Sequence, residues 1–153
     1  MYKWMISLIL VSFSACAAGD PYDYLGLKKS RFQCVELVAD GSVIEVVIPE
    51  RFEFDYDDAS LVGGCVVADL AYMMAQSSTR IKLWITGHAD EPGSVAYNRG
   101  IGQRRADSLA EVLVSSGVDA ERIVTVSEGE SNPLIPTASK ERKNRRLEIT
   151  LSM

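Results

Sequence analysis

Residues 87–106, GHADEPGSVAYNRGIGQRRA, join an apolar strand to a helix through an acidic, glycine-containing loop. Asp90 lies in the loop, and Arg104 and Arg105 lie on the helix that follows. A carboxylate and a guanidinium held on rigid elements can bind a small zwitterion, because each charge of the ligand finds an opposite partner. The stretch therefore predicts both a strand–helix unit and a site for a zwitterionic ligand.

Two strand-like runs precede this unit, at residues 32–40 and 42–48. An Asp-Gly pair between alternating apolar residues, here Asp40-Gly41, predicts a β-hairpin. Pro49 ends the second run, since proline cannot donate a hydrogen bond to a strand ladder.

Two helices and three further strands are expected after the hairpin. A helix from about residue 59, capped by Asp57 or Asp58, has an apolar face at helical spacing, formed by Val62, Val66, Leu70 and Met73. A second helix over residues 95–116 ends at Gly117 and has core positions at Ile101, Leu109 and Leu113. Strands are expected within residues 81–86, 122–127 and 143–152. This order predicts an α+β fold, a two-layer α/β sandwich with helices packed on one face of a mixed sheet.

The chain has 153 residues, of which 47% are apolar, and a formal net charge of −5. The length suits one domain, and the apolar content suits a single packed core. A net negative charge argues against nucleic acid as a partner, because proteins that bind nucleic acid present a basic surface to its phosphates.

The first residues have the pattern of an export signal. Lys3 precedes an apolar run over residues 4–13, which is too short for a bilayer span of about 20 residues. The run has the length of a signal-peptide core, so we expect residues 1–15 to be a signal peptide. A buried helix or strand at an ordinary N-terminus is the alternative.

Residues 13–16, Phe-Ser-Ala-Cys, resemble a bacterial lipobox, in which Cys16 becomes the first residue of the mature protein and carries the lipid. Ala17 follows, and the absence of aspartate there indicates the outer membrane. An ordinary signal peptide cleaved at a neighbouring alanine is the alternative. Residues 16–31 mix glycine, proline and charges without periodicity, so we expect a lipidated N-terminus and a short tether.

Two cysteines remain, Cys34 and Cys65. An exported compartment permits a disulfide between them, and two separate buried thiols are the alternative. His88 is the only histidine, and one histidine cannot build a usual metal site. We therefore expect neither a metal nor a cofactor, and we interpret His88 as a residue whose side chain packs against the loop.

Several spaced motifs carry a resemblance to a known family. GHAD, YN, RRADSL, SSGV, RI, NPL and KNRRLEI follow one another in order. Together they resemble the OmpA-like peptidoglycan-binding domain and, within that family, the peptidoglycan-associated lipoproteins (Pal). The resemblance covers about residues 52–151 and implies one such domain over residues 32–153, with an N-terminal β-hairpin.

The resemblance also implies a ligand, the diaminopimelate group of the peptidoglycan stem peptide, which carries an ammonium and a carboxylate on one carbon. Asp90 matches the family aspartate that takes the ammonium. Arg105 matches the family arginine that takes the carboxylate, which a planar guanidinium can bind bidentately. Asp55 matches an acidic strand end that lines the same pocket, and Asn98 and Arg145 match positions that shape it.

Each of these residues also has an interpretation without a ligand. Asp90 can cap the second helix or its loop. Arg105 can lie on a solvated helix face and pair with Glu91 or Asp107, an interaction worth about 0–1 kcal/mol.

We expect a non-catalytic lipoprotein of the outer membrane, facing the periplasm, that binds peptidoglycan and tethers the membrane to the wall. The alternative is a lipoprotein subunit of an envelope-spanning secretion machine, and Tol-system or secretion-system proteins are the partners considered. A third hypothesis is a wall hydrolase that uses Asp55 and Asp90 as paired carboxylates. No nucleophile–base pair or metal set in the sequence supports it.

Overall fold

The computed structural model describes residues 20–40, 43–48, 54, 64–90 and 92–152. The expected signal peptide, Cys16, Asp55, Val62 and the two capping aspartates lie outside these residues. The described elements, in chain order, are α1 (Pro21–Tyr24), the 3-10 turn η1 (Lys29–Arg31), β1 (Glu36–Asp40), β2 (Val43–Val47), α2 (Gly64–Gln76), β3 (Lys82–His88), α3 (Val95–Ser115), η2 (Ala120–Arg122), β4 (Ile123–Gly129), η3 (Arg142–Asn144) and β5 (Leu147–Ser152).

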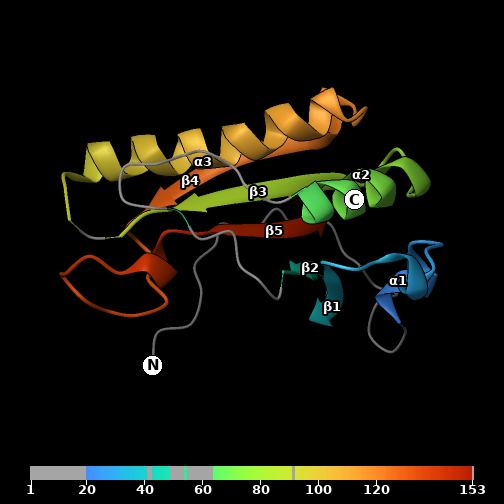
Figure 1. Ribbon diagram of the computed structural model, residues 1–153, viewed down its shortest axis with the longest axis horizontal. Helices are drawn as coiled ribbons and strands as arrows, with labels where there is room; N and C mark the ends of the chain where they lie inside the picture. Colours follow the sequence, from blue (N-terminus) through green and yellow to red (C-terminus); the bar gives the residue numbers. More distant parts are fainter. Residues whose placement is uncertain (1–19, 41–42, 49–53, 55–63, 91, 153) are drawn as a thin grey trace.

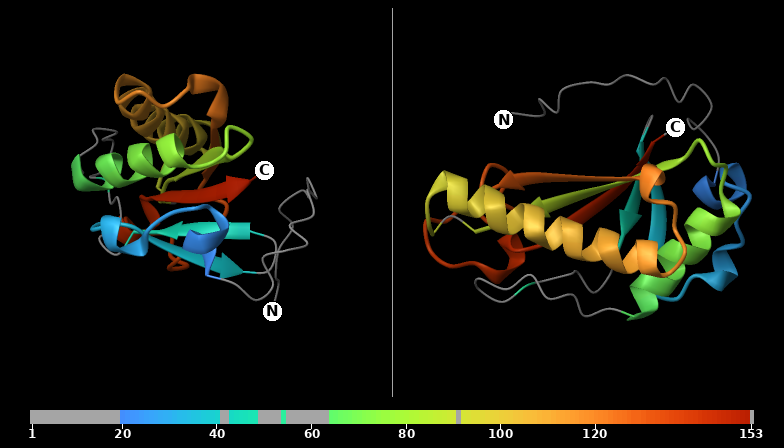
Figure 2. Two further views of the ribbon diagram at one scale, coloured as in Figure 1. Left: turned by 90° about the vertical axis from the view of Figure 1, so that its right-hand side faces the viewer. Right: turned by 90° about the horizontal axis from the view of Figure 1, so that it is seen from above.

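The five strands form one mixed sheet in the order β1-β2-β5-β3-β4. Strands β3 and β4 are parallel, and the other neighbouring pairs are antiparallel. Helices α2 and α3 lie together on one side of the central strands, and α3 runs along β3 and β4 (Figures 1 and 2). The predicted α+β sandwich with helices on one face of a mixed sheet is confirmed. Among the described residues, no helix has the length and apolarity that a membrane crossing requires.

The N-terminal hairpin is confirmed by its register. Asp40 pairs with Val43, which leaves residues 41–42 as a two-residue connection between β1 and β2. Strand β2 then pairs with β5, so the hairpin extends the sheet away from β3.

The core lies between the helices and the sheet. On the helices it contains the predicted positions Val66, Leu70 and Met73 of α2, and Ile101, Leu109 and Leu113 of α3. On β5, Leu147, Ile149 and Leu151 are buried and alternate with more exposed residues, as expected for a strand with one face in the core. Gly117 follows the C-cap of α3 with a φ of +96°, a backbone conformation that favours glycine.

Helix α3 meets the end of β3 through a contact between two glycines. A Cβ atom on Gly87 would lie 1.8 Å from the carbonyl oxygen of Gly102. A Cβ atom on Gly102 would lie 2.4 Å from the hydroxyl of Ser127 and 2.9 Å from the carbonyl oxygen of Gly87. Both glycines are therefore needed for the backbones of α3 and β3 to approach this closely.

Arg122 holds the C-terminal end of α2. Its guanidinium donates to the carbonyl oxygens of Met74, Ser78 and Ile81 at 2.6 Å, 2.9 Å and 3.1 Å. The bond to Met74 gives a partner to a carbonyl group in the last turn of α2, where helices leave carbonyls unsatisfied, and the other two bonds hold the loop that follows. One side chain thus ties η2 to the loop that leads into β3.

The prediction of a tether is wrong for residues 20–31, because this segment is packed against the domain. Tyr22, Leu25 and Leu27 are buried in the core. The Tyr22 hydroxyl accepts a hydrogen bond from the backbone N–H of Leu37 at 3.0 Å, and its ring makes an edge contact with Phe32. Within the segment that indicated a tether, Pro21–Tyr24 form the helix α1 and Lys29–Arg31 form the turn η1, and apolar residues between the polar ones reach the core.

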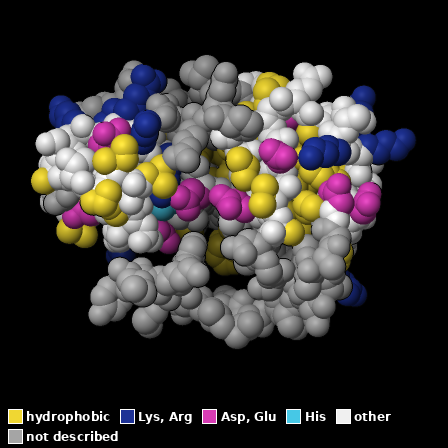
Figure 3. All heavy atoms as spheres, turned by 90° about the horizontal axis from the view of Figure 1, so that it is seen from below, with side chains coloured by type: hydrophobic (Ala, Val, Ile, Leu, Met, Phe, Trp, Pro, Cys, Tyr) yellow, Lys and Arg dark blue, Asp and Glu magenta, His cyan; other side chains and the backbone are white. Residues whose placement is uncertain are grey.

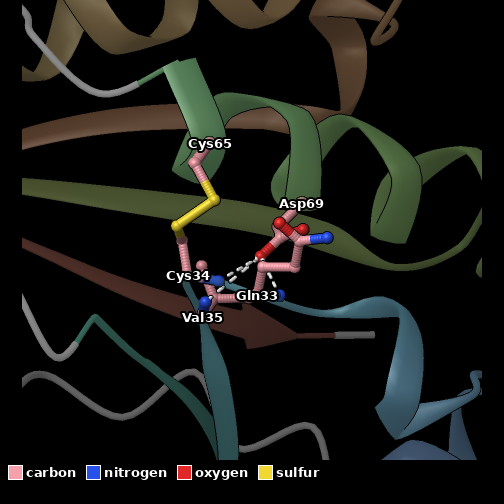
Figure 4. Close-up of a disulfide and its surroundings, with 5 residues drawn as sticks. All are labelled: Gln33, Cys34, Val35, Cys65 and Asp69. Atoms are coloured by element: carbon pink, nitrogen blue, oxygen red, sulfur yellow. Dashed lines mark hydrogen bonds between the residues drawn. A yellow bond between two sulfur atoms is a disulfide. The ribbon is translucent and has the colours of Figure 1, made fainter.

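A disulfide joins Cys34 to Cys65 and attaches the segment before β1 to the start of α2 (Figure 4), so of the two alternatives for these cysteines the structure has the bridge. One turn further along α2, a single carboxylate oxygen of Asp69 accepts the backbone N–H groups of Gln33, Cys34 and Val35 at 2.9, 2.7 and 3.3 Å. For a sequence separation of 31 residues, closing the loop stabilises the folded state by about 3–4 kcal/mol.

The glycine contact predicts different results for two alanine substitutions in the same helix. Gly102→Ala should lower the free energy of unfolding by about 1–3 kcal/mol, because the new methyl group overlaps fixed backbone. Gly100→Ala should be neutral or raise it by up to about 1 kcal/mol, because the new Cβ meets only the Arg104 side chain, at 3.7 Å. Urea unfolding of both variants measures the difference, and equal effects would contradict close packing at Gly102.

Candidate functional site

The end of β3 and the loop after it are held from both sides. The backbone N–H of His88 donates to the carbonyl of Arg146, and that of Ala89 donates to the carbonyl of Gly129, both at 2.9 Å. These bonds continue the contacts of β3 with its neighbours β5 and β4. Asp90 follows directly and therefore projects from a rigid position rather than from a loose loop.

Asp90 forms a buried ion pair. Its Oδ2 accepts from Arg145 Nη1 at 2.7 Å and from the backbone N–H of Glu141 at 3.1 Å, and the residue is only 4% exposed. No partner for Oδ1 is seen among the described residues. The interpretation of Asp90 as a helix cap is wrong, because Ser94 caps α3 by accepting from the N–H of Tyr97.

Arg105 is the largest fully buried side chain of the described part, with 1% exposure. Its Nη1 donates to the carbonyl oxygen of His88 at 3.0 Å. Its guanidinium carbon lies over the ring of Phe54, 4.9 Å from the ring centre. The alternative of a solvated helix face is therefore wrong for Arg105, whereas its neighbour Arg104 is exposed.

Phe54 connects these charged groups. Its N–H donates to the carbonyl of Arg145 at 3.1 Å, and its own carbonyl accepts from Arg145 Nε at 2.8 Å. Its side chain is 3% exposed and contacts Arg105. The sequence did not single out Phe54 for this role, although its position beside the candidate Asp55 is a signal that could have indicated it.

The structure brings Asp90, Arg145 and Arg105 together around Phe54, through the contacts given above. Asn98 lies nearby on the first turns of α3 and is 1% exposed. Its Nδ2 donates to Glu130, just beyond β4. A Cβ atom on Gly93 would lie 2.9 Å from Asn98 Oδ1, so the loop after Asp90 runs close to this amide. Asn98 thus links the loop to the end of β4, whereas Asp55 lies outside the described residues.

His88 is buried on the side of β3 away from the helices. Its Nε2 lies 3.5 Å from a carboxylate oxygen of Glu148, and neither ring nitrogen makes a regular hydrogen bond. Glu148 also accepts from Arg146 Nε at 2.9 Å. Seen from below, this side of the molecule shows acidic side chains among apolar ones (Figure 3).

In the described part of the chain, one cluster of side chains is of the kinds that can bind a metal ion. It consists of Cys34, Cys65 and Asp69, whose possible ligand atoms lie within 4.8 Å of one another. The disulfide uses both sulfurs, and Asp69 accepts the three backbone N–H groups. These contacts account for the cluster without an ion.

The site has the chemistry of a receptor for a small charged ligand. Its described residues place the carboxylate of Asp90 and the guanidinium groups of Arg105 and Arg145 on elements that are fixed by backbone hydrogen bonds. Charged groups that are withdrawn from water interact more strongly than exposed ones. Such an arrangement can distinguish ligands by the placement of both a positive and a negative group.

The sequence model of the OmpA family matches residues 56–146. The chain is similar to the probable lipoprotein YiaD of Escherichia coli (strain K12), with 34% identity over 81% of this chain and 58% of that protein. It is also similar to the peptidoglycan-associated lipoprotein of Legionella pneumophila, with 38% identity over 55% of this chain and 48% of that protein. The chain therefore matches only about half of the length of these curated relatives.

A solved structure is similar to this fold. The crystal structure of the peptidoglycan-associated lipoprotein from Burkholderia pseudomallei has a TM-score of 0.57 and 29% sequence identity. The match covers 67% of this chain and 91% of that one. Its coverage includes most of the other chain, so the two share the architecture of the whole domain.

Glu148 predicts an acid-dependent loss of stability. The contact with His88, followed by the charge of Arg146, lowers the pKa of Glu148 from 4.5 to about 2, against a burial effect that raises it. Because the folded-state pKa is the lower one, this stabilisation is complete above about pH 4.5 and is lost as the pH falls through 2. Urea unfolding should show Glu148→Gln less stable than the wild type at pH 7, with the two converging towards pH 2.

Glu111→Gln, which alters an exposed carboxylate on α3, is the matched control and should follow the wild type across this range. A constant difference between Glu148→Gln and the wild type from pH 7 to pH 2 would contradict the electrostatic origin of the effect.

Proposed function

The chain belongs to the OmpA family, and from this premise we propose that it binds peptidoglycan non-covalently through the diaminopimelate group of the stem peptide. The names of the relatives support this proposal, since two of those compared are peptidoglycan-associated lipoproteins. Domains of this family are structural and are not enzymes, so the hydrolase hypothesis based on Asp55 and Asp90 is set aside.

The observation that carries the proposal is the joint placement of Asp90 and Arg105. Diaminopimelate ends in an ammonium and a carboxylate on one carbon, so a receptor must present an acceptor and a planar donor close together. Asp90 and Arg105 are both buried. Asp90 is held by Arg145, which bonds to the backbone of Phe54, and Arg105 lies against the ring of Phe54. The site is therefore already organised before a ligand binds, which reduces the entropy lost on binding.

Asp90 is proposed to bind the ammonium group. Arg145 and the N–H of Glu141 both donate to Oδ2, which fixes the carboxylate and leaves Oδ1 as the oxygen for the ligand. Arg145 is thus a positioning residue, because it orients Asp90 and compensates the charge of its buried carboxylate.

Arg105 is proposed to bind the ligand carboxylate. A guanidinium presents its N–H donors in a fixed fork, and the bond from Nη1 to the His88 carbonyl fixes the orientation of this fork in Arg105. A bidentate bond to a carboxylate adds geometric selectivity as well as energy. Ligands that lack a carboxylate on the ammonium-bearing carbon should therefore bind more weakly.

The place of action is proposed to be the periplasmic side of the outer membrane. We infer that residues 1–15 direct export and that Cys16 carries the lipid, so that the protein tethers the membrane to the wall. Four residues after Cys16, the chain reaches Asp20, which caps the packed helix α1. These residues extend over at most about 14 Å, so the domain should lie close to the membrane.

Two conservative substitutions test the binding site. Asp90→Asn and Arg105→Lys should each weaken co-sedimentation of the purified domain with peptidoglycan sacculi by about thirtyfold or more, because each removes a buried charged contact with the ligand. Arg104→Lys makes the same chemical change as the second variant at the exposed neighbouring position and should bind like the wild type.

Circular dichroism and urea unfolding of all the variants separate lost binding from lost folding. The proposed function would be refuted by a folded wild-type domain that stays in the supernatant, and the assigned residues by variants that sediment normally.

Lipidation is tested on the protein made in a Gram-negative host. Mass spectrometry of the mature protein should find an N-terminal Cys16 with attached acyl chains, and Cys16→Ser should leave the protein unprocessed or unlipidated. An N-terminal Cys16 without acyl chains, or a mature N-terminus at Gly19, would contradict the lipid anchor and leave an ordinary signal peptide.

A further inference from the structure

Phe54 contacts both halves of the candidate site, but through different parts of the residue. Its backbone N–H and carbonyl bond to Arg145, which in turn holds Asp90. Its ring contacts Arg105. A substitution that keeps the backbone therefore changes the Arg105 side of the site and spares the Asp90 side.

We propose that Phe54 is a positioning residue that sets the guanidinium of Arg105 for carboxylate recognition; this inference rests on the proposed function. The guanidinium carbon lies 4.9 Å from the ring centre, within the range of a cation–π contact. Both side chains are almost fully buried, and the attraction is larger when the pair is removed from water.

The ring is suited to this role because it attracts the cation without taking its hydrogen bonds. An aromatic face offers no strong acceptor, so the N–H donors of Arg105 are not consumed by it. The His88 carbonyl fixes one end of the guanidinium at 3.0 Å, and the ring restricts its remaining movement. An aliphatic side chain of similar size would fill the space but would lose the electrostatic attraction.

A buried arginine would otherwise be expensive to keep in place. Removing a charged group from water is unfavourable unless partners compensate it. Phe54 provides part of this compensation through its ring face, which does not accept a hydrogen bond from Arg105. The pair therefore differs from Asp90 and Arg145, which form a direct ion pair at 2.7 Å.

The test compares two ligands that differ only in the carboxylate. One is a stem tripeptide that ends in diaminopimelate, and the other is the same peptide with lysine in its place. Their affinity ratio, measured by calorimetry, reports the carboxylate contact, whereas the lysine peptide alone reports the ammonium contact. Phe54→Leu should reduce the ratio by about tenfold and leave the affinity for the lysine peptide unchanged.

Two comparisons exclude a merely structural role. Met73→Leu changes the buried core on α2 with little change in volume and should leave the ratio unchanged. In an Arg105→Lys background, Phe54→Leu should have a much smaller effect on the ratio, because the two residues act through one contact. Equal weakening of both ligands by Phe54→Leu would overturn the proposal and indicate a general loss of structure.

A ligand-free measurement keeps this inference separate from the proposed function. In the NMR spectrum of the wild type, the Nε–H proton of Arg105 should show a ring-current shift, and this shift should disappear in Phe54→Leu. An unchanged Arg105 signal in the variant would overturn the positioning role whatever the protein binds. If the wild type binds neither peptide but the signal changes, the proposed function fails while the positioning of Arg105 by Phe54 stands.

Discussion

The close contact of Gly87 with Gly102 is the constraint on which the rest of the site depends. Without Cβ atoms at these two positions, the backbone of α3 can approach the end of β3 to a distance that other residues would prevent. The next turn of the helix then carries Arg105 to the carbonyl of His88, one residue beyond Gly87. The relative position of the loop carboxylate and the helix guanidinium is therefore set by backbone packing rather than by flexible side chains.

The site also shows how buried charges are kept in a small domain. Asp90 and Arg145 neutralise each other directly, and backbone groups of Phe54 and Glu141 satisfy further donors and acceptors. Buried ion pairs contribute little net stability, because the loss of hydration offsets their attraction. Their value here lies in preorganisation, since a rigid pair presents its remaining polar atoms in a fixed direction.

Much of the fold could be predicted from the sequence, because its signals are local. The Asp40-Gly41 pair indicated a hairpin, and the spacing of Ile101, Leu109 and Leu113 indicated the buried face of α3, both of which the structure confirms. The packing of residues 20–31 could not be predicted, because it depends on tertiary contacts: Tyr22 accepts a hydrogen bond from Leu37 of β1, and Tyr22 and Leu25 are buried in a core that distant segments of the chain complete. Composition alone therefore suggested a tether.

The candidate site was predictable to a similar degree. The motifs indicated Asp90, Arg105, Asn98 and Arg145, and the structure places these residues around the end of β3. The pairing of Asp90 with Arg145 and the role of Phe54 depend on contacts between residues 51 to 91 positions apart in the chain, which spacing along one segment cannot show. The family resemblance supplied residue identities, and only the three-dimensional arrangement shows which residue orients which.

The disulfide determines how the domain would respond to a pulling force at its N-terminus. Such a force could peel away only residues 20–33 before it reaches Cys34, which would lengthen the chain by about 45–50 Å. At that point the load passes through the sulfur–sulfur bond to Cys65 and the start of α2, and strands β1 and β2 lie outside the path of tension. The bridge thus limits how far the N-terminal segment can extend under force. The sheet and the site at the end of β3 would stay folded while that segment is pulled out.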